Sequence, residues 1–244
     1  MSEEIMMLRP VIQDQLRGRE NLTVLEAGCG EANYGGYLRN AHFTGIDISE
    51  KQLDRNKVLH KKIVGDIQKY RLPENAFDAI FCWNVLEHLS NPGAALRNFQ
   101  NALRQNGIMV LAMPNVLSLK GLVTKLTPHW VHVWLYRKVK GNPNAGKDDT
   151  GPFRTFLRFS LSPSLLRRFA RQHGLSIEFF HPYESAIQRK TRQKYRFVNR
   201  VLRWTRRATL GRLWTFSSDF IIVLKKASEN GKARLVPDTT PYAG

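Results

Sequence analysis

Residues 24–35 read Val-Leu-Glu-Ala-Gly-Cys-Gly-Glu-Ala-Asn-Tyr-Gly, and this stretch decides the fold. An apolar strand pattern runs up to Glu26, and glycines at positions 28 and 30 then interrupt it. Glycine adopts positive φ angles and lets a ligand approach the backbone closely. We expect a helix to begin near Tyr34 and run toward residue 40, with free N–H groups at its start. The stretch therefore predicts a nucleotide-type ligand site at the carboxyl end of a first strand.

Two glycine-rich motifs compete for this stretch. A dinucleotide fingerprint needs a third glycine where Asn33 stands, and Glu26 would repel a pyrophosphate. The acid-x-Gly-x-Gly pattern instead resembles motif I of the class I S-adenosylmethionine (SAM)-dependent methyltransferases, whose ligand carries a sulfonium and an amine. In the plainer alternative, the glycines only form a turn between a strand and a helix.

Strand and helix patterns alternate along most of the chain. Strand patterns cover residues 42–47, 63–66, 77–83, 108–113, 175–181 and 218–224. Helical patterns cover residues 4–19, 49–59, 91–103 and 162–174. Strands that alternate with helices indicate a doubly wound, mostly parallel α/β sheet.

Acidic residues stand at the ends of the predicted strands. Asp47 ends the second strand, 17 residues after Gly30, where a carboxylate can accept hydrogen bonds from ribose hydroxyls. Asp66 ends the third strand, and Leu-Glu-His-Leu at 86–89 follows the fourth. Taken alone, each acid could be an ordinary turn residue. Together with motif I they resemble the ubiquinone/menaquinone-biosynthesis-like branch (methyltransferase type 11) of the class I methyltransferases.

This resemblance implies a Rossmann-like sheet of seven strands, in the order 3-2-1-4-5-7-6, with helical insertions. It implies SAM as cofactor and S-adenosylhomocysteine as product. The cofactor-binding residues would be Glu26, Gly28, Gly30, Asp47, Ile48, Asp66, Ile67 and Asn84. His88 and His129 are candidate catalytic residues, although His88 could equally be structural and cap the turn near Asn91. No spacing typical of metal ligands stands out, so we predict no metal site.

Composition and charge indicate the class of protein. The 244 residues carry a formal charge of +18, yet residues 1–115 hold 13 basic and 13 acidic residues, so the whole excess lies in the second half. Such a basic half suggests an anionic surface, polymer or substrate, although solubility alone could explain it. Neither a signal-like segment nor a membrane-spanning apolar run is evident, so we expect a cytoplasmic protein. Cys29 and Cys82 are expected to be reduced thiols.

We expect one methyltransferase domain over residues 1–226 and a polar tail over 227–244. Two insertions interrupt its pattern. Residues 116–156 follow the fifth strand, where a lid over the acceptor belongs, and contain His129, Trp130 and Trp134. The two tryptophans could contact an apolar acceptor or simply pack the lid onto the core.

The second insertion, residues 182–216, is strongly basic. No acid occurs between Glu184 and Asp219, but there are ten basic residues over 189–212. Apolar residues 197, 201, 204 and 208 recur at helical spacing, beside a row of arginines at 196, 200, 203 and 207. This amphipathic helix fits an anionic membrane surface or a lipid-linked substrate. It could also pack its apolar row against the sheet edge, or bind nucleic acid.

The predicted function is transfer of a methyl group from SAM to O, N or C of a small-molecule or lipid-like acceptor. The transfer could take place at a membrane surface. One alternative is an RNA methyltransferase that uses the basic half to hold the nucleic acid. A second alternative is a SAM-binding subunit without catalysis. The sequence does not identify the acceptor or the oligomeric state.

Overall fold

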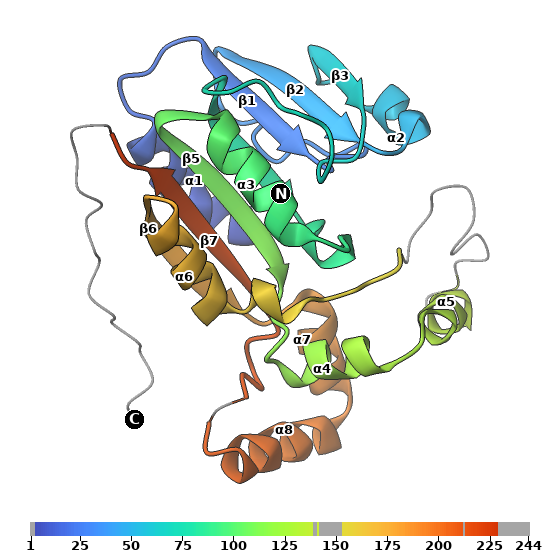
Figure 1. The fold of residues 1–244 in the computed structure, drawn as a ribbon. Helices are drawn as coiled ribbons and strands as arrows, with labels where there is room; N and C mark the ends of the chain where they lie inside the picture. The colour runs from blue at the N-terminus through green and yellow to red at the C-terminus, as the bar shows by residue number, and fades with distance from the viewer. Residues whose placement is uncertain (1–2, 139–140, 142–152, 212, 229–244) are drawn as a thin grey trace.

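A single twisted sheet organises the chain (Figure 1). The computed structural model describes residues 3–138, 141, 153–211 and 213–228. Its strands are β1 (Leu22–Ala27), β2 (Ala41–Asp47), β3 (Lys61–Val64), β4 (Phe77–Trp83), β5 (Leu103–Pro114), β6 (Leu175–Tyr183) and β7 (Asp219–Lys226). Within the described residues their order is β3-β2-β1-β4-β5-β7-β6. All neighbouring pairs are parallel except those that β7 makes with β5 and β6. The predicted Rossmann-like class and strand order are confirmed.

The helices lie on both faces of the sheet and beyond one of its ends. They are α1 (Glu3–Gln15), α2 (Glu50–Arg55), α3 (Pro92–Ala102), α4 (Leu119–Leu126), α5 (His129–Lys138), α6 (Pro163–Gln172), α7 (Ala186–Lys194) and α8 (Arg196–Ala208), with 3-10 turns η1 (Leu86–His88) and η2 (Phe159–Leu161). Ser49 and Asn91 cap α2 and α3, because each side chain accepts a hydrogen bond from a backbone N–H three residues on. In Figure 1, α4, α7 and α8 lie beyond the end toward which the β5 arrow points.

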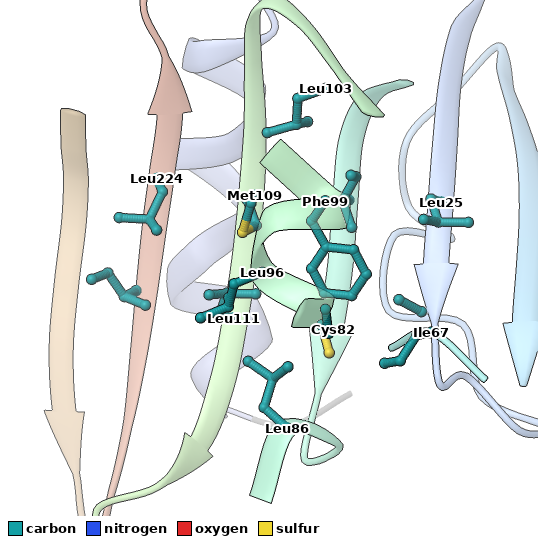
Figure 2. Close-up of a cluster of buried hydrophobic side chains, with 14 of the residues drawn as sticks. Leu25, Ile67, Cys82, Leu86, Leu96, Phe99, Leu103, Met109, Leu111 and Leu224 are labelled. Atoms are coloured by element: carbon teal, nitrogen blue, oxygen red, sulfur yellow. The ribbon is translucent and has the colours of Figure 1, made fainter. Parts of the chain in front are cut away.

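Side-chain alternation along the strands produces one core on each face of the sheet. In β5, Met109, Leu111 and Met113 join the cluster beneath α3 and α6. Residues 108, 110 and 112 of the same strand join the opposite cluster, which α1 covers through Leu8 and Ile12. Successive side chains of a strand point to opposite faces, so only a doubly covered strand is apolar throughout. Figure 2 shows Phe99 of α3 within the first cluster.

The helix expected over residues 34–40 is absent, and this prediction was wrong. Residues 28–40 form turns and bends instead. Gly35 and Gly36 are poor helix formers, and the carboxylate of Glu26 holds the Gly35 N–H at 2.6 Å, which diverts it from a helical partner. Tyr34, Tyr37 and Leu38 from this segment still pack on the sheet face that α1 covers.

Several element ends also differ from prediction. The first helix ends at Gln15, and the helix expected to reach residue 59 ends at Arg55. Asn56 leaves α2 because its side-chain amide donates to the carbonyls of Gly30 and Ala32, which anchors the glycine turn. The third strand begins two residues earlier than expected, at Lys61, and β5 begins at Leu103.

Parts of some predicted segments lie outside the described residues. These are the tail from residue 229 onward, most of the loop over residues 139–152 within the predicted lid, and Arg212. Cys29 and Cys82 are both free and buried, which agrees with the predicted reduced thiols. Every helix in the described part of the chain is too short or too polar to cross a lipid bilayer.

Replacement of Phe99 by alanine tests the first core cluster. The Phe99 side chain is fully buried, so Phe99→Ala leaves a cavity and should lower the free energy of unfolding by about 3–5 kcal/mol. Urea denaturation monitored by circular dichroism measures this change. The control Val58→Ala removes an exposed side chain and should change stability by less than about 0.5 kcal/mol. Equal effects of the two changes would contradict the assignment of Phe99 to the core.

Candidate functional site

The glycine turn lies between the ends of β1, β2 and β4. Gly28 has a φ of +66°, and its N–H donates to the carbonyl of Ile46 at 2.7 Å. A Cβ at Gly28 would lie 2.5 Å from a methyl group of Val85, so a side chain does not fit there. Gly30 also has a positive φ, of 50°. The turn therefore requires glycine at Gly28 for both conformation and space.

Asp47 is joined directly to this turn. Its Oδ2 accepts a hydrogen bond from the Gly30 N–H at 2.8 Å, and its Oδ1 accepts one from the Ser49 N–H at 2.9 Å. Asp47 is half-buried, so part of the residue is exposed to solvent. Each carboxylate oxygen can accept more than one hydrogen bond, and lone pairs remain for ligand hydroxyls.

Asp66 and the two predicted isoleucines lie around the next strand end. β3 pairs with β2 through Asp47 and Val64, which brings the segment after β3 beside Asp47. Asp66 Oδ1 accepts from the backbone N–H and the side-chain amide of Gln68. Ile48 is exposed, whereas Ile67 is buried in the core. The chain thus places a second half-buried carboxylate near the first, beside one exposed apolar side chain.

Glu26 lies deeper than the other predicted residues. Its side chain is buried and accepts from the Gly35 N–H at 2.6 Å. Burial raises the pKa of Glu26 to about 8, against the opposing effect of hydrogen bonds from the Gly35 and Tyr34 N–H groups. Its observed contacts are therefore with the loop that follows the glycine turn.

Asn84 stands at the carboxyl end of β4 in a strained conformation. Its φ is +55°, its N–H donates to the carbonyl of Ala112, and its side chain is exposed. Non-glycine residues in the left-handed region cluster at functional sites. Beside it, the rings of Trp83 and Tyr34 stack with centroids 5.0 Å apart. This stack links the end of β4 to the loop after the glycine turn.

Sequence reasoning missed two polar residues in that loop. Asn33 and Tyr37 help to line a hollow of about 160 Å³, together with Ile5, Tyr34 and Gly36. Both amide atoms of Asn33 and the hydroxyl of Tyr37 are buried and have no hydrogen-bond partner within the described structure. Buried polar atoms normally have partners, so these three atoms fit a polar ligand group. The only sequence signal was their position directly after the glycines.

His88, in η1, lies beside the returning end of the first insertion. Its Nδ1 lies 3.0 Å from the carbonyl oxygen of Arg154, and its ring meets Phe153 edge-on. A carbonyl only accepts, so Nδ1 carries the proton and the lone pair of the neutral ring is on Nε2. Burial lowers the pKa of His88, and the nearby His129 lowers it further, against the effect of the Arg154 carbonyl. This lowered pKa favours the neutral form of the His88 ring at pH 7.

His129 begins α5 and is exposed. Its electrostatic effect on His88 places the two predicted catalytic residues on the same side of the molecule. The neighbouring Trp130 and Trp134 are also exposed, by 70% and 53%. The interpretation that these tryptophans pack the lid onto the core was therefore wrong. The short helix α5 presents them outward.

Glu87 is a third residue whose surroundings the sequence did not reveal. Its carbonyl accepts hydrogen bonds from the N–H groups of Phe156 and Leu157, which holds the insertion against η1. Its carboxyl is buried, and Oε2 has no partner among the described residues. Burial raises the pKa of Glu87 to about 8, with a further increase from Asp219. The insertion is thus anchored beside His88.

Comparisons with known proteins agree with this geometry. The family described as "Methyltransferase domain" matches residues 25–111. The chain is 34% identical over 113 residues to a ubiquinone biosynthesis O-methyltransferase of Dechloromonas aromatica, covering 42% of this chain and 48% of that one. It is 25% identical over 173 residues to a sterol 24-C-methyltransferase of Gibberella zeae, covering 65% of this chain and 38% of that one.

A solved SAM-dependent methyltransferase from Archaeoglobus fulgidus has the same fold. Its TM-score is 0.52 at 20% identity, and the alignment covers 91% of this chain and 93% of that one. By sequence, the chain spans about half the length of the first curated relatives it matches. The matched segment includes the glycine turn, Asp47, Asp66 and the residues around His88. Residues 25–111 thus match the methyltransferase-domain family, and over this part the chain is similar to ubiquinone biosynthesis O-methyltransferases.

Proposed function

We propose that this protein is a SAM-dependent methyltransferase that acts on O, N or C of a small-molecule or lipid-like acceptor. The observation that carries this proposal is the contact between the Gly30 N–H and the Asp47 carboxylate. It joins a glycine turn open to a ligand with an acid suited to ribose hydroxyls. Residues 1–226 would form one domain that includes both insertions.

The residues at this edge fit SAM. Asp47 would accept from the ribose, while Asp66 and the N–H of Ile67 would meet the adenine, with Ile48 beside it. Glu26, Gly28, Gly30 and Asn84 would surround the methionine part. The unpartnered atoms of Asn33 and Tyr37 offer further hydrogen bonds in the adjacent hollow. When bound, SAM supplies an electrophilic methyl group on a sulfonium, and S-adenosylhomocysteine is the product.

The contribution of the chain to the reaction is then alignment and proton removal. The lone pair of the neutral His88 ring is on Nε2, which lies 3.9 Å from Oε1 of the buried Glu87, and the lowered pKa of His88 favours this neutral form at pH 7. It would accept the proton of an acceptor hydroxyl or amine. His129, at the start of α5 in the first insertion, would contact the same acceptor. Names of relatives support a small or lipid-like acceptor, since they refer to ubiquinone biosynthesis and to a sterol.

We also propose a cytoplasmic protein that meets its acceptor at the inner face of an anionic membrane, through residues within 189–212. Support for this location comes from the basic second half of the chain. Nucleic acid is a weaker candidate partner, because the aromatic residues of that segment are not interleaved with its arginines.

The Asp47→Ala change tests the cofactor site. Loss of the carboxylate removes the proposed acceptor for the ribose hydroxyls, so SAM affinity measured by calorimetry should fall about 10- to 100-fold. The control Asp54→Ala removes an exposed acid from α2 and should leave SAM affinity unchanged. Circular dichroism establishes that both variants fold. Undiminished binding by folded Asp47→Ala would overturn the assignment.

The His88→Gln change tests the proposed base. The rate constant kcat, measured with an acceptor found by screening metabolites for gain of one methyl group, should fall about 10²–10⁴-fold. The wild-type rate should decrease only below pH 6.5, as His88 takes up a proton, because its pKa is lowered from that value. This acid limb should be missing from the variant. A full rate with His88→Gln, or an equal loss with the exposed His42→Gln, would contradict the role.

A further inference from the structure

Helix α8 presents an apolar row to solvent. Phe197, Val201 and Trp204 are 62%, 44% and 71% exposed, and Ala208 is exposed at the end of the same row. The sequence left open whether this row packs against the sheet edge. The structure shows that it does not, so that alternative was wrong. A surface helix normally turns its apolar row toward the core.

Another face of α8 holds the helix in place. Leu202 and Thr205 are the buried residues of α8, and they lie about 100° around the helix axis from the apolar row. Arg192 of α7 pairs with Glu184 at 2.8 Å and also contacts Asn199 of α8. Helix α8 is therefore held against the rest of the protein while its apolar row stays exposed.

Arginines border the exposed row on its other side. Arg196, Arg200, Arg203 and Arg207 are all exposed. Within the described part of the chain none of them forms an ion pair. The sequence offers no acid between Glu184 and Asp219 to neutralise them. Aromatic, aliphatic and cationic groups thus share one outward surface, which we define as Arg196, Phe197, Arg200, Val201, Arg203, Trp204, Arg207 and Ala208 and call the α8 surface.

The charge of the α8 surface decides among possible occupants. A second copy of the chain would bring two arginine rows together, and like charges repel. A nucleic acid would neutralise the arginines but would leave the Val201 and Ala208 side chains in water. A helix that lies at the surface of an anionic bilayer accommodates both the apolar side chains and the arginines. The apolar side chains enter the region between headgroups and acyl chains, while the cations remain at the phosphates.

We propose that α8 lies in the plane of an anionic lipid bilayer and docks the protein there through the α8 surface. Phe197, Val201 and Trp204 enter the lipid, and the arginines contact phosphate groups. The helix is long enough for such a contact, since its 13 residues span about 20 Å. The partner is a membrane surface.

The position of α8 relates this docking to the acceptor. Figure 1 shows α8 beyond the carboxyl end of β5, the same end at which α4 and α5 lie. The exposed Trp130 and Trp134 of α5 belong to that end too. Docking through α8 would thus bring the first insertion near the membrane. On the condition that the proposed methyl transfer is correct, the acceptor would be an amphiphile dissolved in the bilayer.

Vesicle sedimentation tests the docking with the full-length protein. Protein should sediment with vesicles of phosphatidylglycerol and phosphatidylcholine but not with phosphatidylcholine alone. The double change Phe197→Ser and Trp204→Ser, and separately the triple change of Arg200, Arg203 and Arg207 to Glu, should each weaken binding at least about tenfold. The matched control changes Lys57, Lys61 and Lys62 to Glu; these lysines are exposed near β3, and the control alters the net charge equally. It should bind nearly as well as wild type.

Tryptophan fluorescence gives a second readout. Anionic vesicles should shift the wild-type emission to the blue, and Trp204→Phe should reduce that shift, to which the exposed Trp130 and Trp134 would also contribute. Three outcomes would overturn the proposal. The lysine control could lose binding to the same extent, the serine variant could bind fully, or the protein could bind RNA oligonucleotides but not vesicles. Asp47→Ala should still sediment with vesicles, so failure of the cofactor assignment and failure of the docking are distinguishable.

Discussion

Burial of the central strands on both faces is the constraint on which the rest of the structure depends. Residues 108–113 of β5 are all fully buried, and β4 is buried along nearly its whole length. An unpaired polar group on these strands would cost free energy, because neither face offers water. Polar residues with free hydrogen-bonding capacity therefore gather where the strands end, as Asp47 and Asn84 do. Since parallel strands end at the same edge, the core itself determines where a ligand can be bound.

The two insertions are fixed to that edge by a partly buried ion pair. Lys120 of α4 contacts Asp219 of β7 at 3.0 Å and the hydroxyl of Ser185 at 3.2 Å. Ser218 donates a further hydrogen bond to Asp219. A partly buried pair is tolerated when such hydrogen bonds satisfy its remaining donors and acceptors. Because Ser185 also caps α7, one cluster positions the start of the first insertion and the start of the second.

The strands could be predicted from sequence, because apolar runs such as 77–83 are strong local signals, whereas their order came from the family resemblance. The acids Asp47 and Asp66 could be placed for the same reason, since each directly follows a strand or lies close to its end. The segment over 34–40 could not, because its conformation depends on a hydrogen bond to Glu26, nine residues earlier. The burial of Glu87 and the contact of His88 with the Arg154 carbonyl could not be predicted either. Both depend on contacts with the returning end of the first insertion, which no local pattern encodes.

Helix α8 shows a different limit of sequence reasoning. Its sequence carries two apolar faces: one contains Phe197, Val201 and Trp204, and the other contains Val198 and Leu202. Periodicity alone cannot decide which face is buried, and the structure buries the smaller, nonaromatic one at Leu202. The more hydrophobic face is therefore left outside, beside arginines that repel one another. Both the exposed aromatic area and the uncompensated charge raise the free energy of the isolated chain, and a single anionic, apolar partner would relieve both.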